Sequence, residues 1–243
     1  DLVANLPMAD IFAHHLRTHA DITAVCGDDS FATENGTYFE KDPDGHIREV
    51  LINMHRPRGY RSLDVFILST ELLRSLVDEC QAHDQYSFRR DVLQAKQALL
   101  NLQSYTWGGF AAQIRSVQEY YDRSMQLLDK DIRADLFTPE RPIRAKGADK
   151  ASTYIGPDGV CLNSLVAEGC RIEGTVVNSI LFPGVTVERG AEVQGCILFR
   201  GTCVRRNARL AHVITDKHVE LLPGRTMMGH ANYPIVIAKN SVV

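Results

Sequence analysis

The sequence predicts an α/β domain that is followed by a parallel β-helix. In the N-terminal half, segments with the period of strands alternate with segments with the period of helices, which is the pattern of α/β proteins. In the C-terminal half, short aliphatic windows repeat at spacings of 15 and 17 residues. The hairpin signals Asn-Gly and Asp-Gly do not occur between residues 164 and 220, so the repeats favour stacked coils over an antiparallel sandwich.

The α/β half contains a hairpin, further strands and several helices. The first helix is predicted over 9–20, where Ile11, Phe12 and Leu16 have helical spacing and Asp10 is the expected N-cap. The hairpin covers 37–54 and turns at 42–45. Further strands are predicted over 21–27 and 62–69, and further helices over 70–80, 88–101 and 116–137.

Three nine-residue windows carry the prediction of the β-helix. They are SLVAEGCRI (164–172), SILFPGVTV (179–187) and CILFRGTCV (196–204), and HVITDKHVEL (212–221) is a degenerate fourth copy. Each of the first three has an apolar pair, a turn that contains Gly, and an alternating apolar end. Such units cannot bury their apolar faces singly, so we expect them to stack into a solenoid.

Composition excludes several classes of protein. The 27 Lys and Arg residues nearly balance the 30 Asp and Glu residues, which argues against nucleic acid or an anionic membrane as a partner. The six cysteines lack CxxC spacing and are interpreted as reduced thiols, without zinc or disulfides. No leader or membrane-spanning run is found, so we expect a cytoplasmic protein. The opening DLVANLP reads as the end of a strand, and we expect the first part of its domain to be absent.

Three motifs resemble those of a known family. VQEYYDRSMQLL is similar to its "aYYeaNmdLL" element, and NSILFPGVTVERGAEVQGCIL and the ending NYPIVIAKNSVV are similar to its β-helix. The family is the sugar-phosphate nucleotidyltransferase known as glucose-1-phosphate adenylyltransferase, or ADP-glucose pyrophosphorylase. The resemblance implies the C-terminal part of a Rossmann-like (GT-A-like) nucleotidyltransferase domain over 1–144. It also implies a left-handed parallel β-helix over 150–243.

HDQYSFRRDVLQA and ELLPGRTMMGHANYPIVI resemble the noncatalytic, D-type subunit of bacterial glycogen synthesis. The resemblance implies a catalytic subunit of the same family, or a second copy of this chain, as partner in a tetramer. The reaction supported would be ATP + glucose 1-phosphate to ADP-glucose + diphosphate. Subunit assembly then outranks catalysis as the expected role of this chain.

The family's metal site is the first place where this sequence departs from the pattern. Active members hold Mg²⁺ with carboxylates, and Gln113 stands where one of these is expected, whereas Asp1 matches the other. A neutral amide lacks the charge that holds Mg²⁺ beside a triphosphate. We therefore expect that this chain binds no Mg²⁺ and that its active site is degraded.

The substrate-binding motifs also differ from the family's pattern in ways expected to weaken the active site. The family's Glu-Lys-Pro element is His55, Arg56 and Pro57 here; Arg56 can still bind phosphate, but His55 removes an acceptor for sugar hydroxyls. Ser62 keeps the Ser of a Ser-Met-Gly element, whose Gly is replaced by Asp64. Arg115 replaces a second expected Gly. The alternative is that Gln113 and Arg56, Arg58 and Arg61 are ordinary solvated residues.

An effector site and two other functions stay open. Arg141, Arg144 and Lys146 lie near the domain junction and could bind a phosphorylated metabolite. Hexapeptide β-helices also occur in acyltransferases, where His212, His218 or His230 would act as general base. The chain could also be a catalytically competent nucleotidyltransferase, or a purely structural partner of a catalytic subunit.

Overall fold

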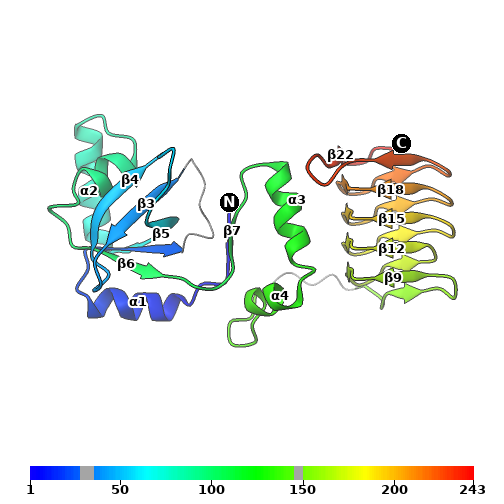
Figure 1. The fold of residues 1–243 in the computed structure, drawn as a ribbon, viewed down its shortest axis with the longest axis horizontal. Helices are drawn as coiled ribbons and strands as arrows, with labels where there is room; N and C mark the ends of the chain where they lie inside the picture. The colour runs from blue at the N-terminus through cyan, green and yellow to red at the C-terminus, as the bar shows by residue number, and fades with distance from the viewer. Residues whose placement is uncertain (28–35, 145–149) are drawn as a thin grey trace. The chain divides into compact units, whose positions relative to one another are not determined.

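The computed structural model describes residues 1–27, 36–144 and 150–243 (Figure 1). The chain forms two compact units, Leu2–Gln113 and Asp1 together with Ile114–Val243. The first is a Rossmann-like α/β unit and the second contains a β-helix, so both predicted architectures are confirmed. Among the described residues, no helix is long and apolar enough to cross a bilayer.

The α/β unit is built on a five-stranded mixed sheet with the order β4-β3-β5-β2-β6. Strand β6 pairs parallel with β2, and the remaining pairs are antiparallel. Its strands are β2 (Ile22–Gly27), β3 (Thr37–Lys41), β4 (Ile47–Ile52), β5 (Tyr60–Leu68) and β6 (Leu102–Thr106). A separate antiparallel pair joins β1 (Leu2–Ala4) to β7 (Ala111–Gln113).

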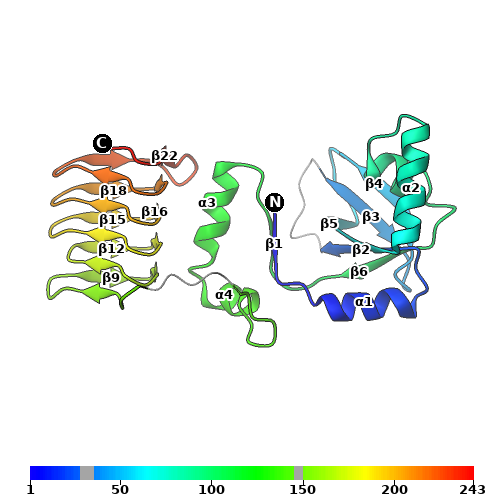
Figure 2. The same ribbon diagram turned by 180° about the vertical axis from the view of Figure 1, so that it is seen from behind.

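Helices cover both faces of this sheet (Figures 1 and 2). Ile11 of α1 (Met8–Arg17) packs against Val25 and Leu63 on one face. The other face is covered by α2 (Thr70–Ala82) and by η2 (Phe88–Gln94), a π-helix, which contribute Leu76, Val92 and Leu93. Because β2 is enclosed on both sides, all six of its residues are buried.

Two of the predicted helices in this unit differ from the structure. Helix α1 starts after Pro7, so Asp10 lies in its first turn and is not the N-cap. Only Ile11 of the predicted apolar stripe is buried, whereas Phe12 and Leu16 are 52% and 58% exposed. The helix predicted over 88–101 ends as regular structure at Gln94. The predicted hairpin is confirmed, since Gly45 N donates to Asp42 O at 3.0 Å between β3 and β4.

The β-helix consists of three parallel sheets of five strands each, which run through its stacked coils (Figure 1). The first sheet contains β8 (Tyr154–Ile155), β11 (Arg171–Ile172), β14 (Thr186–Val187), β17 (Cys203–Val204) and β20 (Glu220–Leu221). The second contains β9 (Val160–Leu162), β12 (Thr175–Val177), β15 (Glu192–Gln194), β18 (Arg209–Ala211) and β21 (Thr226–Met228). The third contains β10 (Leu165–Val166), β13 (Ile180–Leu181), β16 (Ile197–Leu198), β19 (Val213–Thr215) and β22 (Ile235–Ile237).

The register of the third sheet reproduces the spacing of the sequence windows. Leu165 lies beside Ile180, and Ile180 lies beside Ile197, which are the offsets of 15 and 17 residues found in the sequence. Aliphatic side chains from successive coils fill the interior, among them Val176, Val193 and Leu210. The parallel β-helix is thereby confirmed, and its left-handedness stays a prediction of the resemblance.

The corners of the coils require left-handed backbone. A residue one or two positions before four of the five strands of the third sheet has a positive φ: 42° at Asn163, 48° at Asn178, 59° at Gly195 and 51° at His212. Asn and Gly are the residues that adopt this conformation most readily. His212 therefore stands at a corner position of the coil. This structural role is an alternative to a catalytic role for His212.

Two helices belong to the unit that contains the β-helix. Helix α3 (Val117–Gln126) is capped by Ser116, whose side chain accepts from Glu119 N, and α4 (Lys130–Leu136) is capped by Asp129. The single helix predicted over 116–137 is therefore wrong, because Asp129 accepts from the amides of Asp131 and Ile132 and starts a new helix. The boundary predicted near residue 144 also differs from the observed division at Gln113.

The different boundary has a physical cause in the apolar face of α3. Tyr121 forms a buried cluster with Ile197 and Ile214 of the third sheet, and Tyr120 and Met125 pack against it. Apolar residues of β13, β16 and β19 lie on the same face of the β-helix and form a stripe. Helix α3 covers this stripe. The helix buries its amphipathic face on the β-helix and so belongs to that unit.

Candidate functional site

A polar cluster lies where β5 begins, and we call Arg61, Asp64, Arg89 and Gln113 the β5 cluster. Arg61 is only 5% exposed, and its Nη2 donates a hydrogen bond to Oε1 of Gln113 on β7. Nε2 of Gln113 donates to Oδ2 of Asp64 at 3.4 Å. Nη2 of Arg89, from η2, is 2.8 Å from the same carboxylate oxygen. Four polar side chains from three elements are thus joined in one chain of contacts.

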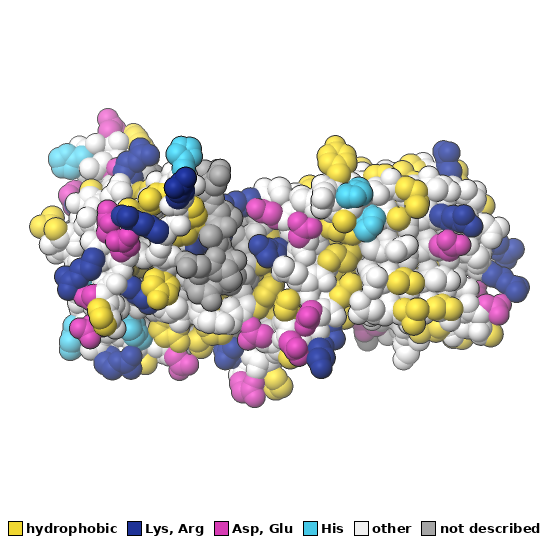
Figure 3. Space-filling model, in the orientation of Figure 1, with side chains coloured by type: hydrophobic (Ala, Val, Ile, Leu, Met, Phe, Trp, Pro, Cys, Tyr) yellow, Lys and Arg dark blue, Asp and Glu magenta, His cyan; other side chains and the backbone are white. Residues whose placement is uncertain are grey.

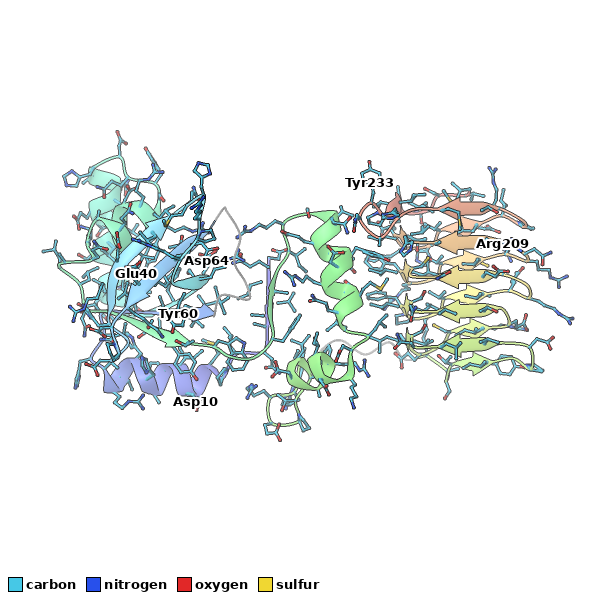
Figure 4. All side chains as sticks on the ribbon, in the orientation of Figure 1. Asp10, Glu40, Tyr60, Asp64, Arg209 and Tyr233 are labelled. Atoms are coloured by element: carbon cyan, nitrogen blue, oxygen red, sulfur yellow. The ribbon has the colours of Figure 1, made fainter. Side chains whose placement is uncertain are left out.

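Asp64, which is labelled in Figure 4, is held in an unusual backbone conformation within β5. Its φ is 59°, in the left-handed region, and its amide donates to Oγ of Ser62 at 3.1 Å. The resemblance expects Gly at this position, and a positive φ is what Gly adopts without strain. Asp is among the side chains that tolerate this region, so the substitution keeps the turn of the backbone and adds a carboxylate to the cluster.

The structure places only part of the predicted substrate site near this cluster. Ser62 is buried and lies beside Asp64. His55 and Arg56 are exposed in the segment between β4 and β5, and neither has a hydrogen bond or an ion pair with another described residue. Arg58, in the same segment, pairs with Glu40 at 2.7 Å and with Glu49 at 3.3 Å.

Arg61 was not among the predicted site residues, and Arg89 was missed as well. The predicted strand starts at Ser62, whereas β5 starts at Tyr60. Within β5, Arg61 lies opposite Tyr38 of β3 and Gly27 of β2, so the neighbouring strands bury its side chain. Extending the alternation of the strand back to Tyr60 would have placed Arg61 in the sheet instead of in a solvated loop.

The second predicted metal ligand, Asp1, lies in the unit that contains the β-helix. It is exposed, and its amino group donates to Ile114 O at 2.9 Å. Within the ranges 1–27, 36–144 and 150–243, no three His, Cys, Asp or Glu side chains are grouped as metal ligands would be.

The three predicted effector residues follow α4. Arg144 is exposed and Arg141 is half-buried, and Arg141 makes contact with other residues. Lys146 lies outside the described residues. Exposure can therefore be given for Arg141 and Arg144 only.

His212 is tied to helix α3 by a hydrogen bond. The hydroxyl of Tyr121 is 2.7 Å from Nδ1 of His212 and donates to Gly195 O at 2.7 Å. A hydroxyl has one proton to donate, so Nδ1 of His212 must itself carry a proton and donate to the Tyr121 oxygen. Burial raises the pKa of Tyr121 to about 12, so its hydroxyl stays protonated at neutral pH.

The other two histidines considered for acyl transfer also lie at turns. His218 has a φ of 58°, at the corner position that Gly169, Gly184 and Gly201 hold in earlier coils. His230 Nδ1 accepts from Asn232 N at 3.2 Å within a tight turn. All three histidines thus stand at turns of the β-helix.

Comparison with known proteins supports the architecture and points to a family. Residues 148–232 match a family model described as "GlmU-like, C-terminal hexapeptide". The glycogen biosynthesis protein GlgD of Bacillus subtilis (strain 168) is 34% identical over 184 residues, which is 75% of this chain and 53% of the relative. The GlgD protein of Geobacillus stearothermophilus is 37% identical over 187 residues, 77% of this chain and 54% of the relative.

Enzymes are found among the similar proteins as well. The glucose-1-phosphate adenylyltransferase of Acetivibrio thermocellus is 29% identical over 164 residues, 66% of this chain and 38% of that protein. The chain spans about half the length of the GlgD relatives that it matches.

Proposed function

Because this chain belongs, as a GlgD-like relative, to the ADP-glucose pyrophosphorylase group, we propose that it is a noncatalytic or regulatory subunit of glucose-1-phosphate adenylyltransferase in glycogen biosynthesis. The reaction supported is ATP + glucose 1-phosphate to ADP-glucose + diphosphate. The observation that supports the proposal is the hydrogen bond between Arg61 and Gln113, because Gln113 stands at the position where the resemblance expects a metal-binding carboxylate.

The β5 cluster does not fit Mg²⁺. A metal ligand needs an oxygen lone pair that is directed at the ion, and Oε1 of Gln113 accepts from the guanidinium of Arg61. The carboxylate of Asp64 accepts from Arg89 and from Gln113. Among the described residues, the cluster contains two guanidinium groups and one carboxylate, and the positive charges oppose the binding of a divalent cation. No catalytic step that depends on a metal is therefore assigned to this chain.

Subunit assembly is the remaining part of the proposal. We expect the partner to be a catalytic subunit of the same family or a second copy of the chain, in a tetramer. The first coil of the β-helix supports this because it exposes aliphatic and aromatic side chains along strands that, in the described part of the chain, pair on one side only. Tyr154, Ile155, Val160 and Leu162 are between 40% and 57% exposed.

The test is a pyrophosphorylase assay in three arms: this chain alone, a catalytic subunit alone, and both together. We expect no turnover by this chain, and a changed rate or effector response when both are present. Robust turnover by this chain alone would overturn the noncatalytic role and favour a competent nucleotidyltransferase. Unchanged kinetics, with no complex seen by analytical ultracentrifugation, would overturn the role as a subunit.

A phosphorylated effector bound at Arg141, Arg144 and Lys146 is part of the same proposal. The exposure of Arg144 supports it, since a solvent-facing guanidinium can form paired hydrogen bonds with a phosphate. Titration calorimetry with sugar phosphates should give heat that is lost in Arg144→Ala and kept in Arg171→Ala, whose guanidinium is paired with Glu173. Identical heats in both variants would exclude Arg144.

A further inference from the structure

We propose that a pocket between α2 and the segment 84–88 of the α/β unit binds a small molecule with an apolar body and a positively charged amine. The proposal goes beyond the role as a subunit and does not depend on it. The pocket has a volume of about 400 Å³, which lies within the range of small-molecule sites. We call it the α2 pocket.

Apolar side chains make up most of the lining of the α2 pocket. Leu76 of α2 and Val92 of η2 are almost completely buried in the core beneath it. Leu73 and Val77 also line it, and both are exposed. They are four residues apart and therefore lie on the same face of α2. A ligand that covers them removes apolar surface from water, which favours binding of an apolar body.

The segment that forms the other wall is held in place at both ends. The amide of Gln85 donates to Cys80 O at 2.9 Å, which ties the segment to α2. The amides of Tyr86 and Ser87 donate to Oδ2 of Asp91 at 3.0 and 2.8 Å, which ties it to η2. A wall that is already ordered loses little conformational freedom when a ligand binds, and this favours affinity.

The polar side of the α2 pocket offers acceptors and no cation. In the described part of the chain, Asp84 is the one charged residue that lines it. Oδ1 of Asp84 accepts from the hydroxyl of Tyr86 at 2.9 Å, and no described residue donates to Oδ2. Oε1 of Gln85, which also lines the pocket, is buried and has no hydrogen-bond partner among the described residues.

These acceptors select the chemistry of the ligand. An acceptor that is buried without a partner costs free energy, so a ligand that brings hydrogen-bond donors to Gln85 gains from satisfying it. A positively charged donor gains further from the carboxylate of Asp84, whereas a phosphate or a carboxylate is repelled by it. The α2 pocket therefore favours an apolar amine over the phosphorylated metabolites expected at Arg144.

The test is a calorimetric titration of the full chain with two probes of matched shape. Tryptamine has an indole ring and a positively charged amine, whereas indole-3-acetate has the same ring and a carboxylate. We expect tryptamine to bind with a dissociation constant of about 1 mM or less, in keeping with its size. Indole-3-acetate should bind at least about tenfold more weakly, because its charge meets Asp84. No saturable binding of tryptamine, or equal affinity for both probes, would overturn the proposal.

Two variants assign the binding to the α2 pocket. Val77→Trp places a larger side chain at its exposed rim and should weaken tryptamine binding at least about tenfold. Because Val77 is exposed, this change leaves the core intact. Asp84→Asn removes the charge, and Asn readily adopts the φ of 54° found at this position. It should abolish the preference for tryptamine over indole-3-acetate. Tryptamine binding to Val77→Trp that is as tight as to the wild type would overturn the site.

The matched control is Asp78→Asn, which makes the same change of charge at an exposed residue of α2 outside the pocket. It should keep the wild-type affinities for both probes. If Asp78→Asn loses the preference as fully as Asp84→Asn does, the selectivity comes from the general charge of the surface, and the role of Asp84 is overturned.

A second copy of the chain is the other occupant that an apolar rim could bind. Sedimentation velocity at several protein concentrations tests it, and we expect the wild type and Val77→Trp to sediment alike. Self-association that Val77→Trp abolishes and that tryptamine leaves unchanged would assign the pocket to a second copy and overturn the proposal. The pyrophosphorylase assay is independent of all these outcomes, so the role as a subunit can stand or fall separately.

Discussion

The hydroxyl of Tyr121 in α3 lies 2.7 Å from Nδ1 of His212, a corner residue of the β-helix. The same hydroxyl donates to Gly195 O, the corner residue of the coil before it. One side chain of the helix thus joins two successive coils at equivalent positions. Because Tyr121 is 4% exposed, water cannot readily replace these hydrogen bonds.

We therefore expect Tyr121→Phe to lower the free energy of unfolding by about 1–3 kcal/mol, the usual cost of leaving a buried polar partner unsatisfied. The ring stays, so apolar packing with Ile197 and Ile214 is kept. Chemical denaturation followed by circular dichroism measures the change.

The matched control is Tyr120→Phe on the same helix, since the Tyr120 hydroxyl interacts with Ser124 of α3 itself. It should cost less than Tyr121→Phe. An equal loss in both variants would contradict the special role of the Tyr121 hydroxyl.

The corner position of His212 leads to a second prediction. Its φ of 51° resembles the values of 48° at Asn178 and 42° at Asn163 in the earlier coils. His212→Asn should therefore keep the backbone, whereas His212→Val places a β-branched side chain in the left-handed region. Val should be less stable than Asn by about 1–2 kcal/mol.

Both variants lack the imidazole, so a difference between them comes from the backbone and not from ring chemistry. Thermal melts of the two proteins side by side measure it. Equal stability would show that the left-handed corner does not constrain residue 212.

The sequence predicts the β-helix in detail because the spacing of its repeats equals the number of residues in one coil. Residues that lie side by side, such as Leu165, Ile180 and Ile197, are related by the spacing of the windows. The helix break at Asp129 could not be predicted in this way. The apolar period continues across it, and only the side chain of Asp129 decides that a second helix starts there.

The β5 cluster could be predicted only in part. The amide at Gln113 stands out because the family expects a carboxylate, but its partner Arg61 belongs to a group of arginines that resembles a solvated loop. Burial of Arg61 depends on β2 and β3, which are distant in the chain. The apolar stripe of α3 likewise does not reveal which partner covers it, which is why the predicted domain boundary differs from the observed one.

The interior of the β-helix gives a third prediction. Leu181 is 1% exposed among the aliphatic residues that fill the coils, and its truncation leaves a cavity. Leu181→Ala should lower the free energy of unfolding by about 2–5 kcal/mol. Leu162→Ala, in the first coil and 57% exposed, should change it by less than about 0.5 kcal/mol. Urea denaturation measures the free energy of unfolding of both variants. Equal losses of stability in the two would contradict the prediction that Leu181 is part of a tightly packed interior.

An ion-pair ladder on the surface of the β-helix leads to the last prediction. Arg205 is 2.8 Å from Oε1 of Glu188 and 2.6 Å from Oε1 of Glu220. It therefore joins carboxylates from successive coils. Figure 3 shows Lys and Arg side chains beside Asp and Glu side chains on the surface of the protein.

The hydrogen bond with Arg205 lowers the pKa of Glu188 below its usual value of 4.5. A carboxyl group whose pKa is depressed by folding stabilises the protein above its unfolded pKa, and that contribution is lost as the pH falls through the folded pKa. Glu188→Gln should therefore cost about 1 kcal/mol at neutral pH, and the difference from the wild type should shrink below about pH 4.

Denaturant unfolding at a series of pH values measures this difference, with Asp158→Asn as control. Asp158 and Arg189 form a more exposed pair, 66% and 76% exposed, which solvent screens. The control should therefore follow the wild type at every pH. If the difference in unfolding free energy between Glu188→Gln and the wild type stays constant as the pH falls, Arg205 does not stabilise the charged form of Glu188.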